Sequence, residues 1–389
     1  MRRLSAWLFL VALLAWLTPV TFAQTFTTFD VPSSTLTEPA AINAWGAITG
    51  SYGASGTLGN RGFLRRPGGV VFTFDVPEYS GRDHVVGTTA INALDQIIGY
   101  VLDLNVNRYH SFLRQPDGTF ATLEVGGPCP VSGAKTRYSR SAFLMVPIQS
   151  FDGDIPVTIN NKGQIAGIYG QLGCHYSFLR QRDGTTIRIE VPTHAEPGPQ
   201  TLAQAMNSRG QVTGYYLADN HNLQGFLWEP NGTITTFGPP DSNVLPTAIT
   251  GRGEIAGSLD GHGFLRQPDG TISTFDPADS ISTYPVAMNA RGQISGYYSD
   301  MSLAYHGFLR EKDGSIVTFD VPDSTNTYPT SMNAAGQITG WYSDANGVVH
   351  GFVRKCRKPA VAMHGNQADG SGSESPLSHQ RRESVVGSQ

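Results

Sequence analysis

A motif recurs seven times along the chain and limits the possible folds more than any other feature. One copy contains Asn289-Ala290-Arg291-Gly292, His306-Gly307-Phe308-Leu309-Arg310 and Thr318-Phe319-Asp320-Val321-Pro322. Its apolar runs are short, rich in β-branched and aromatic residues, and bounded by turn signals, which predicts four strands of about five residues each. Strands A to D of this copy are expected at 285–289, 293–299, 305–311 and 315–321.

The copies align on the four-residue turn between strands A and B. These turns are Asn43 to Gly46, Asn92 to Asp95, Asn160 to Gly163, Asn207 to Gly210, Thr250 to Gly253, Asn289 to Gly292 and Asn333 to Gly336. Asn in first place and Gly in fourth place are typical of a type I turn. The last five strand C phenylalanines are 48, 38, 44 and 44 residues apart, close to the roughly 40–50 residues of known propeller repeats.

The order of the strands indicates a ring. A D strand, 25–31, precedes the first A strand, and the last copy ends after strand C at Arg354. A linear solenoid gains nothing from this offset, whereas a closed ring can use the N-terminal strand to complete its last blade. We therefore predict an all-β, seven-bladed β-propeller of four-stranded antiparallel blades, closed by the N-terminal strand.

The ends of the chain differ from the repeats. Arg2 and Arg3 precede an apolar run over 4–20, and Ala23 suits a cleavage site, so 1–23 is interpreted as a secretory signal peptide. A signal anchor is the alternative. The propeller is expected at 24–358, and the Gly- and Ser-rich segment 359–389 is expected to be a disordered tail without a membrane span. The mature protein would be a monomer, secreted or periplasmic, from a bacterium.

One repeat carries an insertion at 126–156, interpreted as a long loop, with a decayed eighth blade as the alternative. The chain has three cysteines, and their spacing is not that of a zinc site. An exported protein can form disulfides. Cys129–Cys174 is the expected pair, because it would attach the insertion to its own blade, and Cys356 remains unpaired.

The motifs Thr-Phe-Asp-Val-Pro, Ile-Asn-x-x-Gly-x-Ile-x-Gly and His-Gly-Phe-Leu-Arg together resemble the bacterial extracellular HAF repeat family. The triplet that names the family appears here as His262-Gly263-Phe264, His306-Gly307-Phe308, His350-Gly351-Phe352 and His110-Ser111-Phe112. The resemblance covers about 25–354. It implies export and a β-structure built from repeats, and it identifies no functional residues in this sequence.

Few residues have a pattern that indicates chemistry. The His of strand C and the Asp of strand D recur in several copies, whereas a catalytic site is singular, so we interpret them as hydrogen bonds within each blade. No nucleotide fingerprint, nucleophile elbow or metal spacing occurs, so neither a cofactor nor a metal is predicted. The net charge of −4 gives no basic surface for nucleic acid.

The connections fall into two classes. The A–B and C–D turns are short and alike, and we call the side they form the turn face. The D–A and B–C connections are longer and differ between copies, and they form the opposite, variable face, which suits recognition. Its unrepeated groups, all speculative ligand contacts, are Glu78, Arg82, Asp83, His84, His194, Glu196, Tyr284 and Tyr328.

Two functions compete for these residues. The first is a secreted binding module that holds an extracellular protein or glycan on the variable face. The second is an extracellular hydrolase or lyase that acts on a polymer such as a polysaccharide, with Asp83, His84, His194 and Glu196 as acid–base or metal-binding groups. The absence of a catalytic motif favours the binding module. Convergence of those four side chains would favour the enzyme.

Overall fold

The computed structural model describes residues 24–53, 60–123, 125, 152–171, 174–194 and 200–356. They belong to one compact unit, Gln24–Arg357. Within these residues the secondary structure consists of β-strands and one short 3₁₀ helix, η1 (Pro77–Tyr79), which confirms the all-β expectation. The signal peptide, the C-terminal tail, most of the 126–156 insertion and the side chains of the expected disulfide lie outside the described residues.

Antiparallel pairing joins the strands in groups of four, and each group is called a blade below. The blades are β2 (Leu36–Ile42), β3 (Ile48–Gly53), β4 (Arg61–Arg65) and β5 (Val71–Phe74); β6 (His84–Ile91), β7 (Ile97–Asp103), β8 (Arg108–Arg114) and β9 (Phe120–Leu123); β10 (Asp152–Ile159), β11 (Ile165–Gln171), β12 (Cys174–Arg180) and β13 (Thr186–Ile189); β14 (Thr201–Met206), β15 (Val212–Leu217), β16 (Leu223–Trp228) and β17 (Ile234–Phe237). The others are β18 (Val244–Ile249), β19 (Ile255–Leu259), β20 (His262–Arg266) and β21 (Ile272–Phe275); β22 (Ser282–Met288), β23 (Ile294–Ser299), β24 (Tyr305–Arg310) and β25 (Ile316–Phe319); and β26 (Asn326–Met332), β27 (Ile338–Ser343) and β28 (Val349–Cys356) with β1 (Gln24–Phe29).

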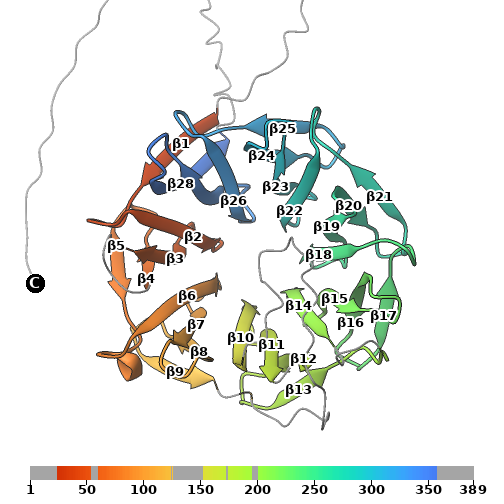
Figure 1. Ribbon diagram of the computed structural model, residues 1–389, viewed down its shortest axis with the longest axis horizontal. Helices are drawn as coiled ribbons and strands as arrows, with labels where there is room; N and C mark the ends of the chain where they lie inside the picture. Colours follow the sequence, from red (N-terminus) through yellow and green to blue (C-terminus); the bar gives the residue numbers. More distant parts are fainter. Residues whose placement is uncertain are drawn as a thin grey trace, which may run out of the picture. The chain divides into compact units, whose positions relative to one another are not determined.

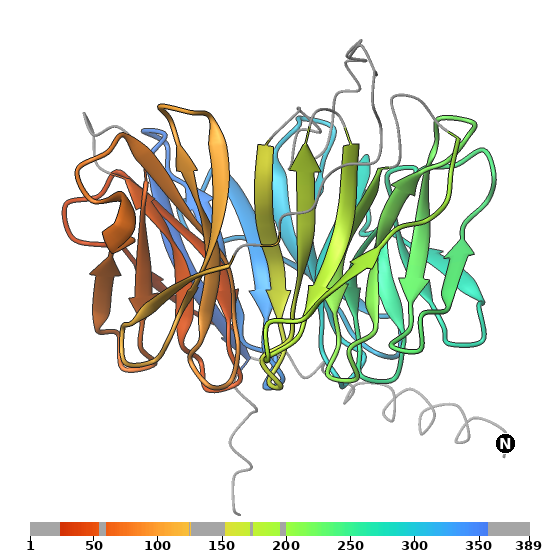
Figure 2. The same cartoon turned by 90° about the horizontal axis from the view of Figure 1, so that it is seen from below.

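The strands of the described unit form five sheets, of which two have eight strands and three have four. Short parallel contacts join two blades within each eight-stranded sheet, for example Leu36 of β2 beside Val349 of β28. The blades are arranged around a central axis. The strand of each blade that lies innermost is β2, β6, β10, β14, β18, β22 or β26 (Figure 1). The connections gather on two opposite sides of the unit (Figure 2), as alternating antiparallel strands require.

The N-terminal strand pairs with the last strand, as predicted. The ladder between β1 and β28 runs from Gln24 opposite Cys356 to Phe29 opposite Gly351. It covers an edge of β28 that would otherwise expose unpaired main-chain groups. β26, in the same blade, also contacts the first repeat, since Thr330 Oγ1 donates to the main-chain oxygen of Pro39 at 2.8 Å.

The Asn of an A–B turn has two roles in five of the blades. Its side-chain oxygen accepts hydrogen bonds from its own turn: Asn43 Oδ1 lies 3.0 Å from the main-chain nitrogen of Trp45 and 2.9 Å from that of Ala47. Its Nδ2 donates to the turn of the next blade, where the main-chain oxygen of Asn92 lies 3.1 Å away. The same inter-blade bond is made by Asn92, Asn160, Asn207 and Asn333, and we call this series the amide ladder.

The amide ladder also joins the last repeat to the first, because Asn333 Nδ2 donates to the main-chain oxygen of Asn43 at 3.2 Å. Thr250 occupies the equivalent position in one blade. Its hydroxyl accepts within its own turn, from the main-chain nitrogens of Arg252 and Glu254, and it has no amide to extend toward the next blade. The ladder is therefore interrupted at Thr250. It is also interrupted at Asn289, whose Nδ2 donates to Gln293 Oε1 at 2.7 Å and lies 3.7 Å from Met332 Sδ of the next blade.

The strand C phenylalanine is the centre of each blade's packing. All seven are at most 2% exposed: Phe63, Phe112, Phe178, Phe226, Phe264, Phe308 and Phe352. The ring needs a glycine beside it on strand B. A Cβ atom added to Gly296 would lie 2.7 Å from Phe308 Cε1 and 2.2 Å from the main-chain oxygen of Tyr284. The Gly and Phe of the repeat motif are thus one packing unit.

Candidate functional site

The repeated His and Asp residues form hydrogen bonds within a blade, as predicted. Nδ1 of the strand C His lies beside the Asp that follows strand D. The pairs are His262 and Asp276 at 2.7 Å, His306 and Asp320 at 3.0 Å, and His350 and Asp30 at 2.9 Å. The last pair joins β28 to the end of β1. Because the arrangement recurs from blade to blade, it is a structural feature of the repeat.

His306 has a second acidic neighbour, since its Nε2 lies 3.3 Å from Asp300 Oδ2. Burial alone would lower the pKa of His306, but hydrogen bonds to and the charges of Asp320 and Asp300 raise it above 6.5. The Ser302 hydroxyl, neighbouring main-chain N–H groups and His306 lower the pKa of Asp300 to about 2. In the described residues no group of three His, Cys, Asp or Glu side chains is placed to hold a metal ion.

Four of the predicted site residues lie between β5 and β7, and each forms a hydrogen bond or an ion pair within the fold. They are Glu78, Arg82, Asp83 and His84. The Thr122 hydroxyl donates to Glu78 Oε2 at 2.7 Å, and Arg82 lies 3.5 Å from Asp103 Oδ2. Asp83 is exposed, and its main-chain oxygen accepts from Leu104. These contacts fix the shape of the connection.

His84 is buried rather than exposed in a loop, because it is the first residue of β6. Its Nε2 lies 2.7 Å from Asp75 Oδ1, and its Nδ1 lies 2.8 Å from the main-chain oxygen of Arg82. Arg61 completes this group through an ion pair of 2.7 Å with Asp75. Both ring nitrogens are therefore used within the fold.

His194 lies in a different connection. Its side chain is 97% exposed, and its Nδ1 is 3.5 Å from Asp219 Oδ2. Glu196 lies outside the described residues. Within the part of the chain that the structure describes, His84 and His194 have different partners on different blades. The geometry of these residues gives no support to the enzyme alternative.

Tyr284 and Tyr328 lie inside β22 and β26 rather than in the connections before them. They belong to an aromatic cluster formed by Tyr284, Tyr297, Tyr305, Tyr328 and Trp341. Tyr284 stacks on Tyr297 at 5.0 Å, and Tyr328 stacks on Trp341 at 4.0 Å, in both cases with the residue opposite it on the next strand.

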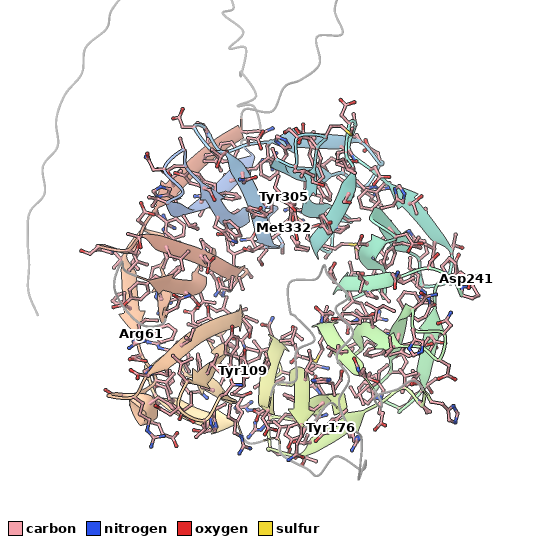
Figure 3. All side chains as sticks on the ribbon, in the orientation of Figure 1. Arg61, Tyr109, Tyr176, Asp241, Tyr305 and Met332 are labelled. Atoms are coloured by element: carbon pink, nitrogen blue, oxygen red, sulfur yellow. The ribbon has the colours of Figure 1, made fainter. Side chains whose placement is uncertain are left out.

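The cluster spans two blades near the variable face. Tyr297 lies 5.3 Å from Tyr328 of the next blade, and Tyr305 lies 5.0 Å from Tyr328. Tyr305, labelled in Figure 3, comes from the first residue of β24, at the variable-face end of that strand. Tyr297 is buried, whereas the other four rings are only partly buried. The cluster therefore presents aromatic surface as well as filling the space between blades.

The phenols of the cluster are poor acids. Burial, followed by the influence of Tyr305, raises the pKa of Tyr328 to about 12, and burial together with Tyr284, Tyr328 and Tyr305 raises that of Tyr297. Acid–base work at neutral pH would need the opposite shift. Neutral hydroxyl groups can still donate and accept hydrogen bonds. The cluster is therefore suited to contact a ligand rather than to transfer a proton.

The sequence interpretation missed Tyr297, Tyr305 and Trp341, and it also missed Glu38. Glu38 occupies in β2 the same place before the β-bulge as Tyr284 occupies in β22. Burial raises its pKa, and its charge acts on Tyr100 of the next blade. Alignment of the repeats by strand A would have placed Glu38 in register with the tyrosines.

No protein-family model matches the chain, and no curated protein matches its sequence. The structure is similar to that of virginiamycin B lyase from Staphylococcus aureus, with a TM-score of 0.53 and 12% identity over 85% of this chain and 99% of that one. Puromycin hydrolase (TM-score 0.48, 14% identity, 81% of this chain and 52% of that one) and a lectin from Aleuria aurantia (TM-score 0.42, 11% identity, 74% and 97%) are also similar. Identity this low shows the fold alone.

The described unit thus has an all-β fold of the β-propeller type. In the described residues no helix is long and apolar enough to cross a membrane.

Proposed function

We propose that the repeats form a closed, seven-bladed propeller, and that the protein is an exported member of the HAF repeat family. Three contacts between the ends of the repeat region support closure: the β1–β28 ladder, Thr330 on the Pro39 carbonyl, and Asn333 on the Asn43 carbonyl. The family and the export rest on the sequence motifs and on the apolar N-terminal run.

We further propose that the protein is a binding module that holds an extracellular glycan or protein on its variable face. The aromatic cluster is the observation that carries this proposal. Partly buried, stacked rings with neutral hydroxyls offer apolar contact area that loses little side-chain entropy on binding, together with hydrogen-bonding groups at the ring edges. Aromatic side chains of this kind are enriched at interfaces.

The experiment is a glycan and protein array probed with the full-length protein, followed by affinity measurements on the best ligand. Tyr328→Ala removes the ring that contacts three other members of the cluster and should weaken binding at least tenfold. Tyr328→Phe keeps the ring and removes only its hydroxyl, so it separates stacking from hydrogen bonding. Because the contacts are aromatic and polar, the affinity should change little with salt.

Tyr342→Ala is the matched control, because Tyr342 is a tyrosine of β27, the strand that pairs with β26, but stacks on His350, outside the cluster. It should leave the affinity unchanged. The proposal fails if Tyr328→Ala and Tyr342→Ala weaken binding equally. It also fails if the best ligand is turned over and Asp83→Ala or His194→Ala abolishes that turnover without altering binding, because the protein would then be an enzyme.

A further inference from the structure

The turn face, expected to be uniform, has an uneven distribution of charge. The third residue of each A–B turn is exposed and lies on the inner strands' side of this face. In chain order these residues are Trp45, Leu94, Lys162, Arg209, Arg252, Arg291 and Ala335. Four consecutive blades thus present a cation, although the net charge of the chain is −4. In the described residues none of these four cations forms an ion pair.

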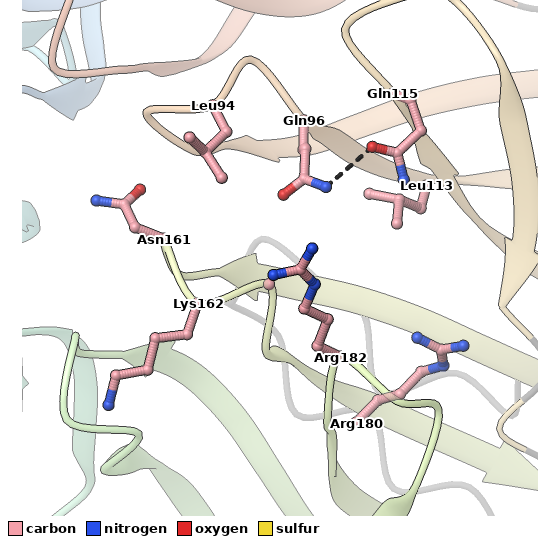
Figure 4. Close-up of a pocket in the computed structure, with 9 residues that line it drawn as sticks. Leu94, Gln96, Leu113, Gln115, Asn161, Lys162, Arg180 and Arg182 are labelled. Carbon is pink, nitrogen blue, oxygen red and sulfur yellow. Dashed lines mark hydrogen bonds between the residues drawn. The ribbon is translucent and has the colours of Figure 1, made fainter.

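A pocket of about 250 Å³ lies between the β6–β9 and β10–β13 blades (Figure 4). Lys162, the first of the four cations in chain order, is part of its lining. We call this pocket the basic pocket. Its lining includes three cations, Lys162, Arg180 and Arg182, and no carboxylate. The guanidinium of Arg182 points from the β12–β13 turn toward Gln96 (Figure 4). Within the described residues none of these three cations forms an ion pair, so the pocket is a place for a negatively charged group.

The rest of the lining is suited to a ligand with hydroxyl groups and an apolar face. Gln96 Nε2 donates to Gln115 Oε1 at 2.9 Å, and Gln96 Oε1 accepts from Asn92 Nδ2 at 2.8 Å, so both amides are held in place and the amide nitrogen of Gln115 can donate to a ligand. Leu94 and Leu113 supply the apolar part of the wall. Charge, amides and a small apolar surface together fit an acidic sugar.

Trp45 extends this surface beyond the pocket. Its side chain is exposed (72%), yet its Nε1 donates to the main-chain oxygen of Ala93 at 2.9 Å, next to Leu94 of the pocket. The hydrogen bond holds the indole across the neighbouring turn, where a ligand can reach the ring. A fixed and exposed aromatic ring beside a polar pocket is suited to pack on the apolar face of a sugar.

An anionic lipid surface fits this face less well. The C–D turns carry Asp117, Asp183, Asp269 and Asp313, and hydrogen bonds from the residue two positions later lower the pKa of each. These carboxylates stay charged at neutral pH and would repel a flat anionic bilayer that covered the whole face.

We propose that the turn face binds an acidic polysaccharide, with Arg182 in the basic pocket and Lys162, whose side chain points away from Arg182 (Figure 4), pairing with the carboxylates of different sugars and Trp45 packing on a neighbouring sugar. This surface is separate from the variable face, so the proposal does not depend on the function given above. The remaining cations, Arg209, Arg252 and Arg291, would continue the path of the chain along the face.

The test is calorimetric titration of the full-length protein with hexagalacturonate and with a neutral galactose hexamer. Hexagalacturonate should bind at least tenfold more tightly than the neutral probe, and its affinity should fall as salt is added. The double variant Lys162→Gln/Arg182→Gln should weaken it at least tenfold. Trp45→Ala should weaken it several-fold. All three side chains involved are exposed, and a thermal melt confirms that each variant is folded.

Lys312→Gln is the matched control, because Lys312 occupies in the β24–β25 turn the position that Arg182 occupies in the β12–β13 turn. It removes the same charge from the same face outside the pocket, and it should change the affinity less than twofold. The single variant Arg182→Gln should weaken binding several-fold, and the proposal is overturned if Lys312→Gln weakens it as much as Arg182→Gln. It is also overturned if the neutral probe, phosphatidylglycerol vesicles or a DNA oligonucleotide binds as tightly as hexagalacturonate.

Discussion

Replacing Asn333 with Thr would remove the amide that joins the last repeat to the first. Nδ2 of Asn333 donates to the main-chain oxygen of Asn43 at 3.2 Å and to Gln337 Oε1 at 2.8 Å. A Thr hydroxyl can still accept from the main chain of its own turn, as that of Thr250 does. Each lost hydrogen bond costs about 1 kcal/mol. The Thr250 hydroxyl also donates to Glu254 Oε2 at 2.9 Å, so a Thr at 333 can keep the bond to Gln337 and loses only the bond to Asn43. The free energy of unfolding should therefore fall by about 1 kcal/mol.

Asn333→Ala would also remove the bond to Gln337 and the two hydrogen bonds that Oδ1 accepts within the turn, so four are lost and the expected decrease is about 4 kcal/mol. Urea unfolding followed by tryptophan fluorescence measures both decreases. Asn207→Thr is the control, because Asn207 Nδ2 also donates one bond within its own turn and one to the next blade, and these two blades are consecutive in the chain. If Asn207→Thr destabilised the protein and Asn333→Thr did not, the first and last repeats would not be in contact in solution.

Two further predictions concern the stability of the protein. Deleting 24–32 removes a ladder of six residue pairs and exposes an edge of β28, so the melting temperature should drop, and an unchanged value would contradict ring closure. The pH dependence of stability should reflect Asp300 and His306. The lowered pKa of Asp300 contributes stability that is present above pH 3.8 and lost as the pH falls toward about 2. The raised pKa of His306 contributes stability that is present below pH 6.5 and lost as the pH rises through the raised value. His306→Gln should abolish the second loss, and a retained loss would refute the assignment.

The repeat motif was sufficient to predict the order of the strands and the partner of the N-terminal strand, because turn signals and alternating apolar residues are local. The bounds of strand A were less accurate. The motif predicts Pro285 as its first residue, but β22 begins at Ser282. The register shifts between Pro285 and Ala287, so the proline lies at a β-bulge, where a residue without an N–H is tolerated. Local propensity does not show whether a proline begins a strand or interrupts one.

The candidate site was harder to predict, because it depends on contacts between blades. Tyr284 and Tyr328 could be selected as residues that differ between copies. Tyr297 and Trp341 lie opposite them on the next strands and complete the cluster only when two blades pack together. His84 was misplaced for a similar reason, since its partner Asp75 follows the preceding D strand. Spacing along the sequence does not report such tertiary contacts.

The pairing of β1 with β28 has a consequence for the order of events during folding. Partners in this ladder are about 330 residues apart along the chain, whereas every other blade is built from four consecutive strands. The first strand of the unit, β1, therefore remains unpaired until β28 has been synthesised. Closure of so long a loop is also slow. During that interval both partners expose free edges, and at high concentration β1 of one molecule can pair with β28 of another to give a domain-swapped dimer.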